Sequence, residues 1–356
     1  MPFITDMFHD QNGTFDRATG AVVTSASTAF DLGLFVERLG ARILGQPEAL
    51  QAVARAVSIA HAGVADPGRP LASVLLVGPT GIGKTELVRQ VAAQLRSGPD
   101  DLCRIDMAAL AQEHYAASFS GAPPGYAGSK ESFTLFDKNK IEGDPYTPGI
   151  VLLDEIEKAD ATVIRALLHV LDSGELRLAN GRERISFRNS YVFITSNLGS
   201  RTVADEQRHD RRRPAWQRWL RPARFNSTVH SNDVVTKAVE TFFDPEFFNR
   251  IDEMVVMNPF DDSTARQVTT LEVGLLVRRL ARESVDLHID PSVVDFLQEC
   301  GFDPVYGARG LRRTIREHLV APVAESLLAT RRSGRAPVAL NAVRAGGTIV
   351  VTSEAG

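Results

Sequence analysis

Cysteine and long apolar runs are scarce in this sequence. Only two cysteines, Cys103 and Cys300, occur in 356 residues, with no paired spacing and no His/Cys cluster that would hold zinc. No run of about 18 apolar residues is present, as a membrane-spanning helix would need. The N-terminus also lacks a basic start followed by an apolar stretch. We therefore expect a cytoplasmic protein in a reducing compartment, without a membrane span.

A strong excess of charge of either sign is also lacking. The net charge is -4 and the pI is about 6.1, which argues against a surface that tracks nucleic acid throughout. Arginine nevertheless gathers in the segment 207–224, which also holds both tryptophans, Trp216 and Trp219. This Arg/Trp segment either contacts a partner, an acidic surface or nucleic acid, or is an exposed loop or short helix packed by its tryptophans.

A glycine-rich loop carries the clearest chemistry in the chain. It follows the apolar run 73–77 and reads Gly78, Pro79, Thr80, Gly81, Ile82, Gly83, Lys84 and Thr85. In this pattern backbone N–H groups face phosphate oxygens, Lys84 reaches the β- and γ-phosphates, and the Thr85 hydroxyl binds Mg²⁺. We expect ATP and Mg²⁺ to bind here, and we count Glu86 among the nucleotide-binding residues.

Short apolar runs alternate with helical patterns on both sides of this loop. We expect strands at 73–77, 102–105, 150–153 and 191–195, and helices at 85–95 and 162–171. Helices broken near Gly45 are expected over 31–62. The alternation predicts an α/β fold with a parallel sheet between helices, whose functional loops follow the carboxyl ends of the strands.

Two of these strands end in polar residues suited to phosphate chemistry. Asp154 and Glu155 follow the run 150–153; Asp154 would place Mg²⁺ and Glu155 would polarise the attacking water. Asn197 follows the run 191–195 and can donate a hydrogen bond to the γ-phosphate or the water. The alternatives are a helix cap for the acids and an ordinary turn for Asn197, but the order after the phosphate loop favours an ATP hydrolase.

The chain changes character near residue 261. Helical patterns at 265–281, 293–297 and 311–328 precede a final strand at 348–352, which predicts a small, mostly helical C-terminal domain. We expect an N-terminal arm over 1–30 whose composition allows disorder, a large ATPase domain over 31–260 and the small domain over 261–356.

Nine segments closely resemble the second ATPase module of the Clp/ClpB-type AAA+ unfoldases. The resemblance extends over about residues 41–330. Besides the phosphate loop, the matching strings include GAPPGY at 121–126, LDEIEKA at 153–159, TSNLGS at 195–200, FNRIDE at 248–253 and DPVYGAR at 303–309.

The resemblance implies roles for residues that patterns alone do not single out. Arg250 is similar to the arginine finger that reaches the nucleotide of a neighbouring subunit, and Arg309 to a second sensor on the small domain. Ile43 and Leu44 align with the segment that lines the adenine. Tyr126 and Ala127 resemble the pore loop that grips polypeptide, although the family usually has a bulkier aliphatic residue at position 127.

The chain also departs from the larger Clp proteins. Only about forty residues precede its ATPase module, so we expect a stand-alone form that assembles as a single hexameric ring. The Ile-Gly-Phe or Ile-Gly-Leu tripeptide that docks a ClpP-type protease does not occur between Gly199 and Phe248. We therefore expect a protease-independent motor that remodels protein clients, with an adaptor, the N-terminal arm or the Arg/Trp segment selecting them.

Two other classes of function remain as alternatives. The Arg/Trp segment could bind phosphates and stack bases in a nucleic-acid-directed AAA+ ATPase. The chain could instead be a scaffold whose assembly is controlled by nucleotide. ATP hydrolysis that is stimulated by DNA would indicate the nucleic-acid-directed ATPase. A rate of hydrolysis that changes neither with unfolded protein nor with the Tyr126→Ala substitution would indicate the scaffold.

Overall fold

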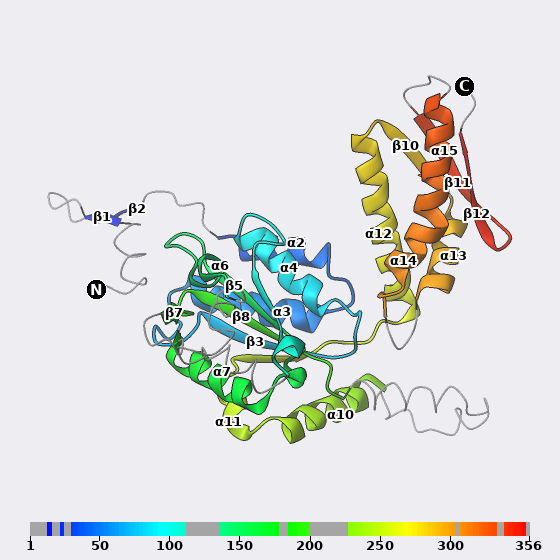
Figure 1. Cartoon of the computed structure of the whole chain (residues 1–356). Coiled ribbons are helices and arrows are strands. Elements are labelled where there is room, and N and C mark those ends of the chain that lie inside the picture. The colour runs from blue at the N-terminus through cyan, green and yellow to red at the C-terminus, as the bar shows by residue number, and fades with distance from the viewer. Residues whose placement is uncertain are drawn as a thin grey trace, which may run out of the picture. The chain divides into compact units, whose positions relative to one another are not determined.

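The computed structural model describes residues 13–15, 22–24, 30–111, 136–177, 184–199, 227–302, 307–332 and 338–353 (Figure 1). By their contacts they form two units. Unit 1 comprises Met1–Gly78 and Gly83–Met257, and unit 2 comprises Pro79–Ile82 and Asn258–Gly356. No helix in these described ranges is both long and apolar enough to span a membrane.

A parallel sheet of five strands is the centre of unit 1. The strands are β3 (Ala72–Val77), β4 (Cys103–Asp106), β5 (Gly149–Asp154), β8 (Ser190–Ser196) and β9 (Glu253–Val256), in the spatial order β4-β5-β8-β3-β9. All four pairings are parallel, with Val74 opposite both Phe193 and Glu253. The carboxyl ends of β5, β8 and β3 therefore lie side by side at one edge.

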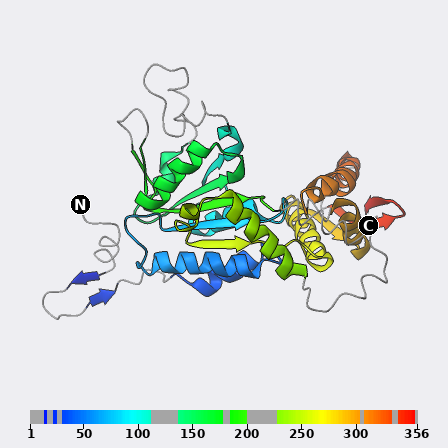
Figure 2. The same cartoon turned by 90° about the horizontal axis from the view of Figure 1, so that it is seen from below.

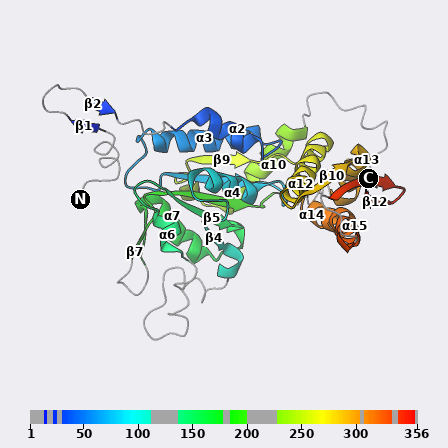
Figure 3. The ribbon, with the colours of Figure 1, turned by 90° about the horizontal axis from the view of Figure 1, so that it is seen from above.

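Helices cover both faces of this sheet. On one face α2 (Leu32–Gly40), α3 (Pro47–His61) and α4 (Lys84–Leu95) pack together, with α3 against β3 and β9 and α4 against β5 and β8. The other face is buried under α7 (Ala161–Ser173), α10 (Ser227–Phe242) and α11 (Pro245–Phe248). Figures 2 and 3 show α3 and α7 on opposite sides of the sheet.

The strands are apolar on both faces because both faces are covered. Leu75, Val151, Val192 and their alternate neighbours belong to the core beneath α7, and every residue of β3 and β8 is buried. Smaller elements complete unit 1. They are the pairs β1 (Gly13–Phe15) with β2 (Val22–Thr24) and β6 (Glu175–Arg177) with β7 (Arg184–Ser186), helix α6 (Lys138–Glu142), and the 3₁₀ turns η1 (Met107–Leu110) and η3 (Ile156–Lys158).

Unit 2 packs helices on a three-stranded sheet. Its strands are β10 (Val285–Ile289), β11 (Val338–Ala345) and β12 (Thr348–Ser353), with β10 parallel and β12 antiparallel to β11. The helices are α12 (Asp262–Arg282), α13 (Pro291–Gly301), α14 (Leu311–Ile315) and α15 (Ala321–Arg332), with a π-helical turn, η4 (Arg316–Val320), between the last two. Val293, Leu297, Leu311 and Leu319 are central to its core.

The structure confirms the α/β class and the strands and helices predicted around the phosphate loop. Beyond the smaller elements, the prediction differs in the following respects. Strand β9 was not predicted, because four residues beside the asparagine-arginine motif carry too short a pattern. Strands β10 and β11 add to the single strand expected in the small domain. The helix expected over 311–328 is divided by the π-helical turn and extends to Arg332.

Candidate functional site

The phosphate loop connects β3 to α4, as the sequence predicts. Gly78, Gly81 and Gly83 all have positive φ angles, of 149°, 79° and 104°. A Cβ at Gly83 would meet nothing within 4 Å, so the left-handed backbone and not the available space requires glycine there. Gly83 is also the N-cap of α4. Thr85 and Glu86 follow in the first turn of α4, where the backbone N–H groups have no partner within the helix.

Lys84 lies at the meeting point of the three central strands. Its side chain is buried, and Nζ donates to the Gly78 carbonyl and, over 2.8 Å, to Asn197 Oδ1. The Gly78 N–H in turn donates to Ser196 O at the end of β8 (3.1 Å). The strand order β5-β8-β3 produces this arrangement, since it places Asn197 beside the phosphate loop from more than a hundred residues away.

The acidic pair occupies the end of β5, next to Asn197. Asn197 Nδ2 donates to Glu155 Oε1 over 3.1 Å. The Thr195 hydroxyl donates to Asp154 Oδ1 (2.6 Å) and accepts from the Glu155 N–H (3.0 Å). Lys84, Asn197 and Glu155 thus form a continuous chain of hydrogen bonds, with Asp154 joined to it through Thr195.

Glu155 has an unusual backbone conformation. Its φ and ψ angles are 59° and 55°, in the left-handed region, where a side chain costs about 1–2 kcal/mol. One other non-glycine residue of the described chain, Ser284, also has a positive φ. The Thr195 hydroxyl and the bond from Asn197 support this conformation. Strain at a residue held by specific polar contacts is typical of functional positions.

Three polar neighbours of the acids were not assigned roles from the sequence. Arg104, at the end region of β4, donates to Asp154 Oδ2 from Nη2 (2.6 Å) and Nε (3.2 Å). Glu157 Oε1 accepts the Asn197 N–H (3.1 Å). Thr195 is the third. For Thr195 the sequence held a signal, because it lies two residues before Asn197 in the same motif. The position of Arg104 follows from the register that pairs Asp106 with Asp154, which only the assembled sheet sets.

Arg250 lies at the opposite edge of the sheet. It precedes β9, and the Asp252 N–H donates to Ser73 O, at the start of β3 (3.0 Å). Since β3 runs from there to the phosphate loop, at about 3.3 Å per residue the two edges are about 15–20 Å apart. Nε of Arg250 pairs with Asp172 Oδ1 at 2.8 Å. The structure therefore does not bring Arg250 to Lys84 of its own chain.

The remaining predicted residues are placed as follows. Ile43 is buried and Leu44 half-buried in the turn between α2 and α3. Arg309 is exposed in unit 2, in the turn before α14; within that unit the neighbouring Ala308 N–H donates to Gly81 O over 3.1 Å. Tyr126, Ala127 and the Arg/Trp segment lie outside the described residues.

The residues of the site fit a nucleotide with its magnesium ion. A buried ammonium, glycines with positive φ and a helix start together suit polyphosphate. Asp154 already faces a cation, the Arg104 guanidinium, so its carboxylate is placed to hold positive charge. Within the described ranges no three His, Cys, Asp or Glu side chains form a metal cluster. Mg²⁺ in such sites is held by one or two carboxylates together with substrate phosphates.

Comparisons with known proteins agree with this geometry. The model of the AAA domain (Cdc48 subfamily) matches residues 69–254, and that of the C-terminal D2-small domain of ClpB matches 260–338. An "ATP-dependent protease ATP-binding subunit-like protein" of Rhodococcus erythropolis is 61% identical over 99% of both chains. A similarly named protein of Pseudomonas aeruginosa, AmiB, is 44% identical over 86% of this chain and 82% of its own.

Larger chaperones match with part of their length. Chaperone protein ClpB 1 of Thermosynechococcus vestitus is 38% identical over 82% of this chain, which spans 31% of ClpB 1. A cryo-EM structure of Hsp104 with ATPγS and FITC casein superposes with a TM-score of 0.73 at 26% identity, over 92% of this chain and 52% of Hsp104. The chain belongs to the Clp/ClpB-type AAA+ ATPases, enzymes that hydrolyse ATP.

Proposed function

We propose that the chain is an ATP-driven protein-remodelling motor that hydrolyses ATP between the subunits of a hexameric ring. The observation that carries this is the position of Arg250. Its guanidinium belongs to the edge of the sheet opposite Lys84, Glu155 and Asn197, so it cannot reach the phosphates of its own subunit. A neighbouring subunit that offers this edge to the site would supply the arginine and make hydrolysis depend on assembly.

Each polar group of the site then has a distinct task. Lys84 neutralises phosphate charge, and Glu155 orients and polarises the attacking water. Asn197 bridges Lys84 and Glu155, so it can report whether a γ-phosphate has come between them. Arg250 of the neighbouring subunit would stabilise the charge that develops on the transferred phosphoryl group. Arg309 would bind the phosphates from the small domain and link hydrolysis to its movement.

Thr85 and Asp154 would hold Mg²⁺, which when bound neutralises charge on the β- and γ-phosphates. Contacts within the chain already orient the Asp154 carboxylate, because Oδ1 accepts the Thr195 hydroxyl and Oδ2 faces Arg104. The side chain is only 13% exposed, so its orientation is set by these contacts and not by solvent.

The proposed substrate is unfolded polypeptide. The Hsp104 structure that this chain resembles contains FITC casein, and Tyr126 belongs to the GAPPGY string, which resembles a pore loop. We assign Tyr126 and Ala127 to substrate gripping, because an aromatic ring can pack against side chains of any sequence. Client selection would fall to an adaptor or to the Arg/Trp segment.

We further propose that the motor works without a ClpP-type protease. The support is the sequence between Gly199 and Phe248, which has no Ile-Gly-Phe or Ile-Gly-Leu tripeptide. Two relatives are nevertheless named as protease-subunit-like. Degradation of casein by the chain mixed with a ClpP-type peptidase would contradict this part of the proposal.

The test is ATP hydrolysis with and without casein, in the wild type and in Tyr126→Ala. We expect casein to stimulate the wild-type rate and to lose that effect in the variant, with basal hydrolysis retained. Phe242→Ala is a suitable control, because it removes an exposed aromatic side chain on α10 that does not belong to the pore-loop motif. Stimulation by DNA in place of casein would favour the nucleic-acid-directed alternative, and no stimulation by either would favour the scaffold.

A further inference from the structure

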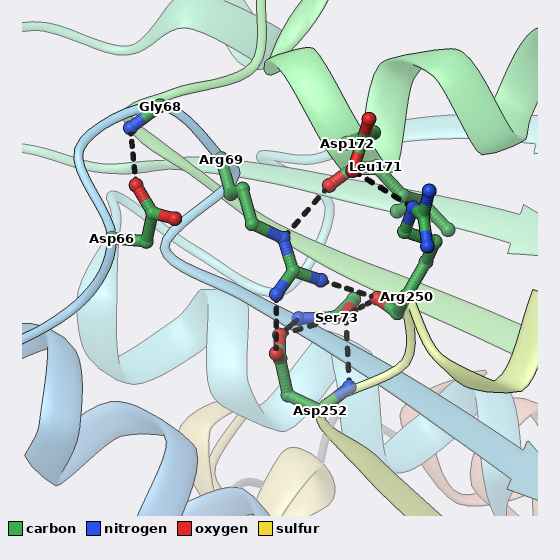
Figure 4. A network of polar contacts seen from close by, with 8 residues as sticks. All are labelled: Asp66, Gly68, Arg69, Ser73, Leu171, Asp172, Arg250 and Asp252. Atoms are coloured by element: carbon green, nitrogen blue, oxygen red, sulfur yellow. Dashed lines mark hydrogen bonds and ion pairs between the residues drawn. The ribbon is translucent and has the colours of Figure 1, made fainter.

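A turn before β3 presents Arg69 to the edge of the sheet where Arg250 lies. Asp66 Oδ1 accepts the Gly68 N–H (2.8 Å), and the Arg69 N–H donates to Asp66 O (3.2 Å). The turn lies close to the end of α7, since a Cβ on Gly174 would stand 2.9 Å from Gly68 O. The direction of the Arg69 side chain is therefore set by local hydrogen bonds and by packing against α7 (Figure 4).

The Arg69 guanidinium connects its own turn to two segments that are distant in sequence, the end of α7 and residues 250–252. Nη2 donates to the Arg250 carbonyl over 2.8 Å, and Nε donates to the Leu171 carbonyl over 3.2 Å. Nη1 lies 3.6 Å from Asp252 Oδ1. Figure 4 shows the planar group pointing into the space between these partners. A guanidinium suits this task because its donors diverge in one rigid plane, which an ammonium cannot reproduce.

Ser73 holds the same backbone from the sheet side. Its hydroxyl lies 2.8 Å from Arg250 O and 2.7 Å from Asp252 Oδ2, and its N–H donates to the same carboxylate oxygen over 2.7 Å. The carbonyl of Arg250 is therefore within hydrogen-bond distance of two donor groups, one from the turn and one from β3. Ser73 is buried, so its contacts are not diluted by water.

The side chain of Arg250 is held by the same part of α7 that Arg69 binds. Arg69 contacts the Leu171 carbonyl, and the next residue, Asp172, pairs with Arg250 Nε at 2.8 Å. Arg69 thus fixes the backbone of Arg250 directly and its guanidinium indirectly, through the end of α7. The ion pairs alone would contribute little, because Asp172 and Asp252 are 56% and 41% exposed. The hydrogen bonds from Arg69 to the carbonyls of Leu171 and Arg250 therefore determine the position of Arg250.

We propose that Arg69 is a positioning residue for the Arg250 guanidinium, acting through the Arg250 carbonyl and the end of α7. The inference rests on the proposed function, since it assumes that Arg250 completes a neighbour's site. A finger that is misplaced by about 1 Å can cost about 100-fold in rate, so a clamp at the base of the side chain would be needed for full activity. The guanidinium of Arg69 is taken up by the carbonyls of Leu171 and Arg250 and by Asp252, so we assign it a positioning role and not a contact with nucleotide.

The test is a double-mutant cycle on the turnover of ATP. Arg250→Ala should lower kcat by about 10³-fold, the lower range for an arginine finger. Arg69→Gln should lower kcat by about 10- to 100-fold, with KM for ATP unchanged, because Lys84 and the phosphate loop lie at the other edge. The kcat of Arg69→Lys should also remain low, because lysine keeps the positive charge but lacks the divergent N–H donors of the guanidinium. Added to Arg250→Ala, Arg69→Gln should have no further effect.

Arg55→Gln is the matched control. Arg55 makes a bidentate pair with Glu253, the first residue of β9, so its loss also removes an arginine contact near the start of this strand. It does not contact Arg250, and kcat should stay at the wild-type value. Ser73→Ala, a near-isosteric change, provides a second route if Arg69→Gln fails to fold or assemble: it should lower kcat and have no further effect in the Arg250→Ala background.

The outcomes distinguish a failure of the proposed function from a failure of the role assigned to Arg69. If Arg250→Ala leaves kcat unchanged, the proposed hydrolysis between subunits fails, and the role of Arg69 with it. If Arg250→Ala lowers kcat but Arg69→Gln raises KM, or multiplies the defect of Arg250→Ala, then Arg69 has only a structural role and the inference is overturned while the proposed function stands. Wild-type kcat in both Arg69→Gln and Ser73→Ala would also overturn it.

Discussion

At the scale of one residue, Glu155 combines a strained backbone conformation with a side chain that accepts a specific hydrogen bond. Its left-handed backbone, with φ of 59°, turns the chain out of β5, while Oε1 accepts the Asn197 amide. The conformation is supported by Thr195, on the neighbouring strand β8. The cost of the backbone conformation is therefore met by contacts from another strand, and the carboxylate remains within reach of the phosphate loop through Asn197.

Glu155→Gln should separate binding from hydrolysis. The amide occupies the same volume, and the backbone strain is unchanged, but it cannot accept a proton from the attacking water. We expect kcat to fall by at least about 100-fold, with ATP binding and assembly retained. Steady-state hydrolysis and titration with a fluorescent ATP analogue would check this. Glu240→Gln, the same change at an exposed position on α10, should behave as wild type; wild-type turnover in Glu155→Gln would show that another group is the base.

At the scale of elements, several helices begin at an aspartate that caps their first turn. Asp31, Asp160, Asp261 and Asp290 each accept a backbone N–H at the start of α2, α7, α12 or α13. In α12 the Thr264 hydrogen bonds, followed by that from Ser263, lower the pKa of Asp261 below its ordinary value of 3.8. The ionised carboxylate also lies at the positive end of the α12 dipole.

Asp261→Ala should destabilise the fold in a pH-dependent manner. Because the pKa is lower in the folded chain, the ionised cap stabilises it above the unfolded pKa, and this contribution is lost as the pH falls through the folded value. The variant should melt at a lower temperature than wild type at pH 7, with the difference shrinking below pH 3.8. Asp261→Asn, which retains an acceptor, should melt close to wild type at pH 7. An equal difference for Asp261→Ala at every pH would contradict the assigned cause.

At the scale of the whole molecule, the sheet separates Arg250 from the other residues proposed for hydrolysis. Lys84, Glu155 and Asn197 lie at the carboxyl ends of the strands, and Arg250 lies at the amino ends. In the proposed assembly one chain would offer an incomplete site at one edge of its sheet and the arginine for a neighbour's site at the other. Such head-to-tail complementarity generates a ring when the rotation between subunits closes.

The rate of ATP hydrolysis per subunit should accordingly rise with protein concentration. Dilution would separate Arg250 from its neighbour's phosphates, so the rate should fall in parallel with the assembled fraction measured by analytical ultracentrifugation. Arg250→Ala should hydrolyse slowly at every concentration while still assembling. A wild-type rate that stays constant per subunit while the assembly dissociates would show that each chain hydrolyses ATP alone.

The sequence by itself determined the α/β class and singled out Lys84, Glu155 and Asn197, which the structure brings together. Each motif is local, a strand followed by a short run of glycines, acids or an amide, so pattern and spacing were enough to select these residues as candidates. Short elements were not predicted. Strand β9 is formed by four residues whose pairing with β3 stabilises them, and a four-residue pattern has too little information to indicate that pairing.

Only the tertiary structure decided which side chains support these motifs. Arg104 meets Asp154 across 50 residues, Thr195 meets Glu155 across 40, and Arg69 meets the Arg250 carbonyl across 181. Such contacts depend on the order β4-β5-β8-β3-β9 and on the parallel register, which bring remote strand ends together. Sequence patterns report the period and the ends of an element, whereas the neighbours of an end are set by how the sheet is assembled.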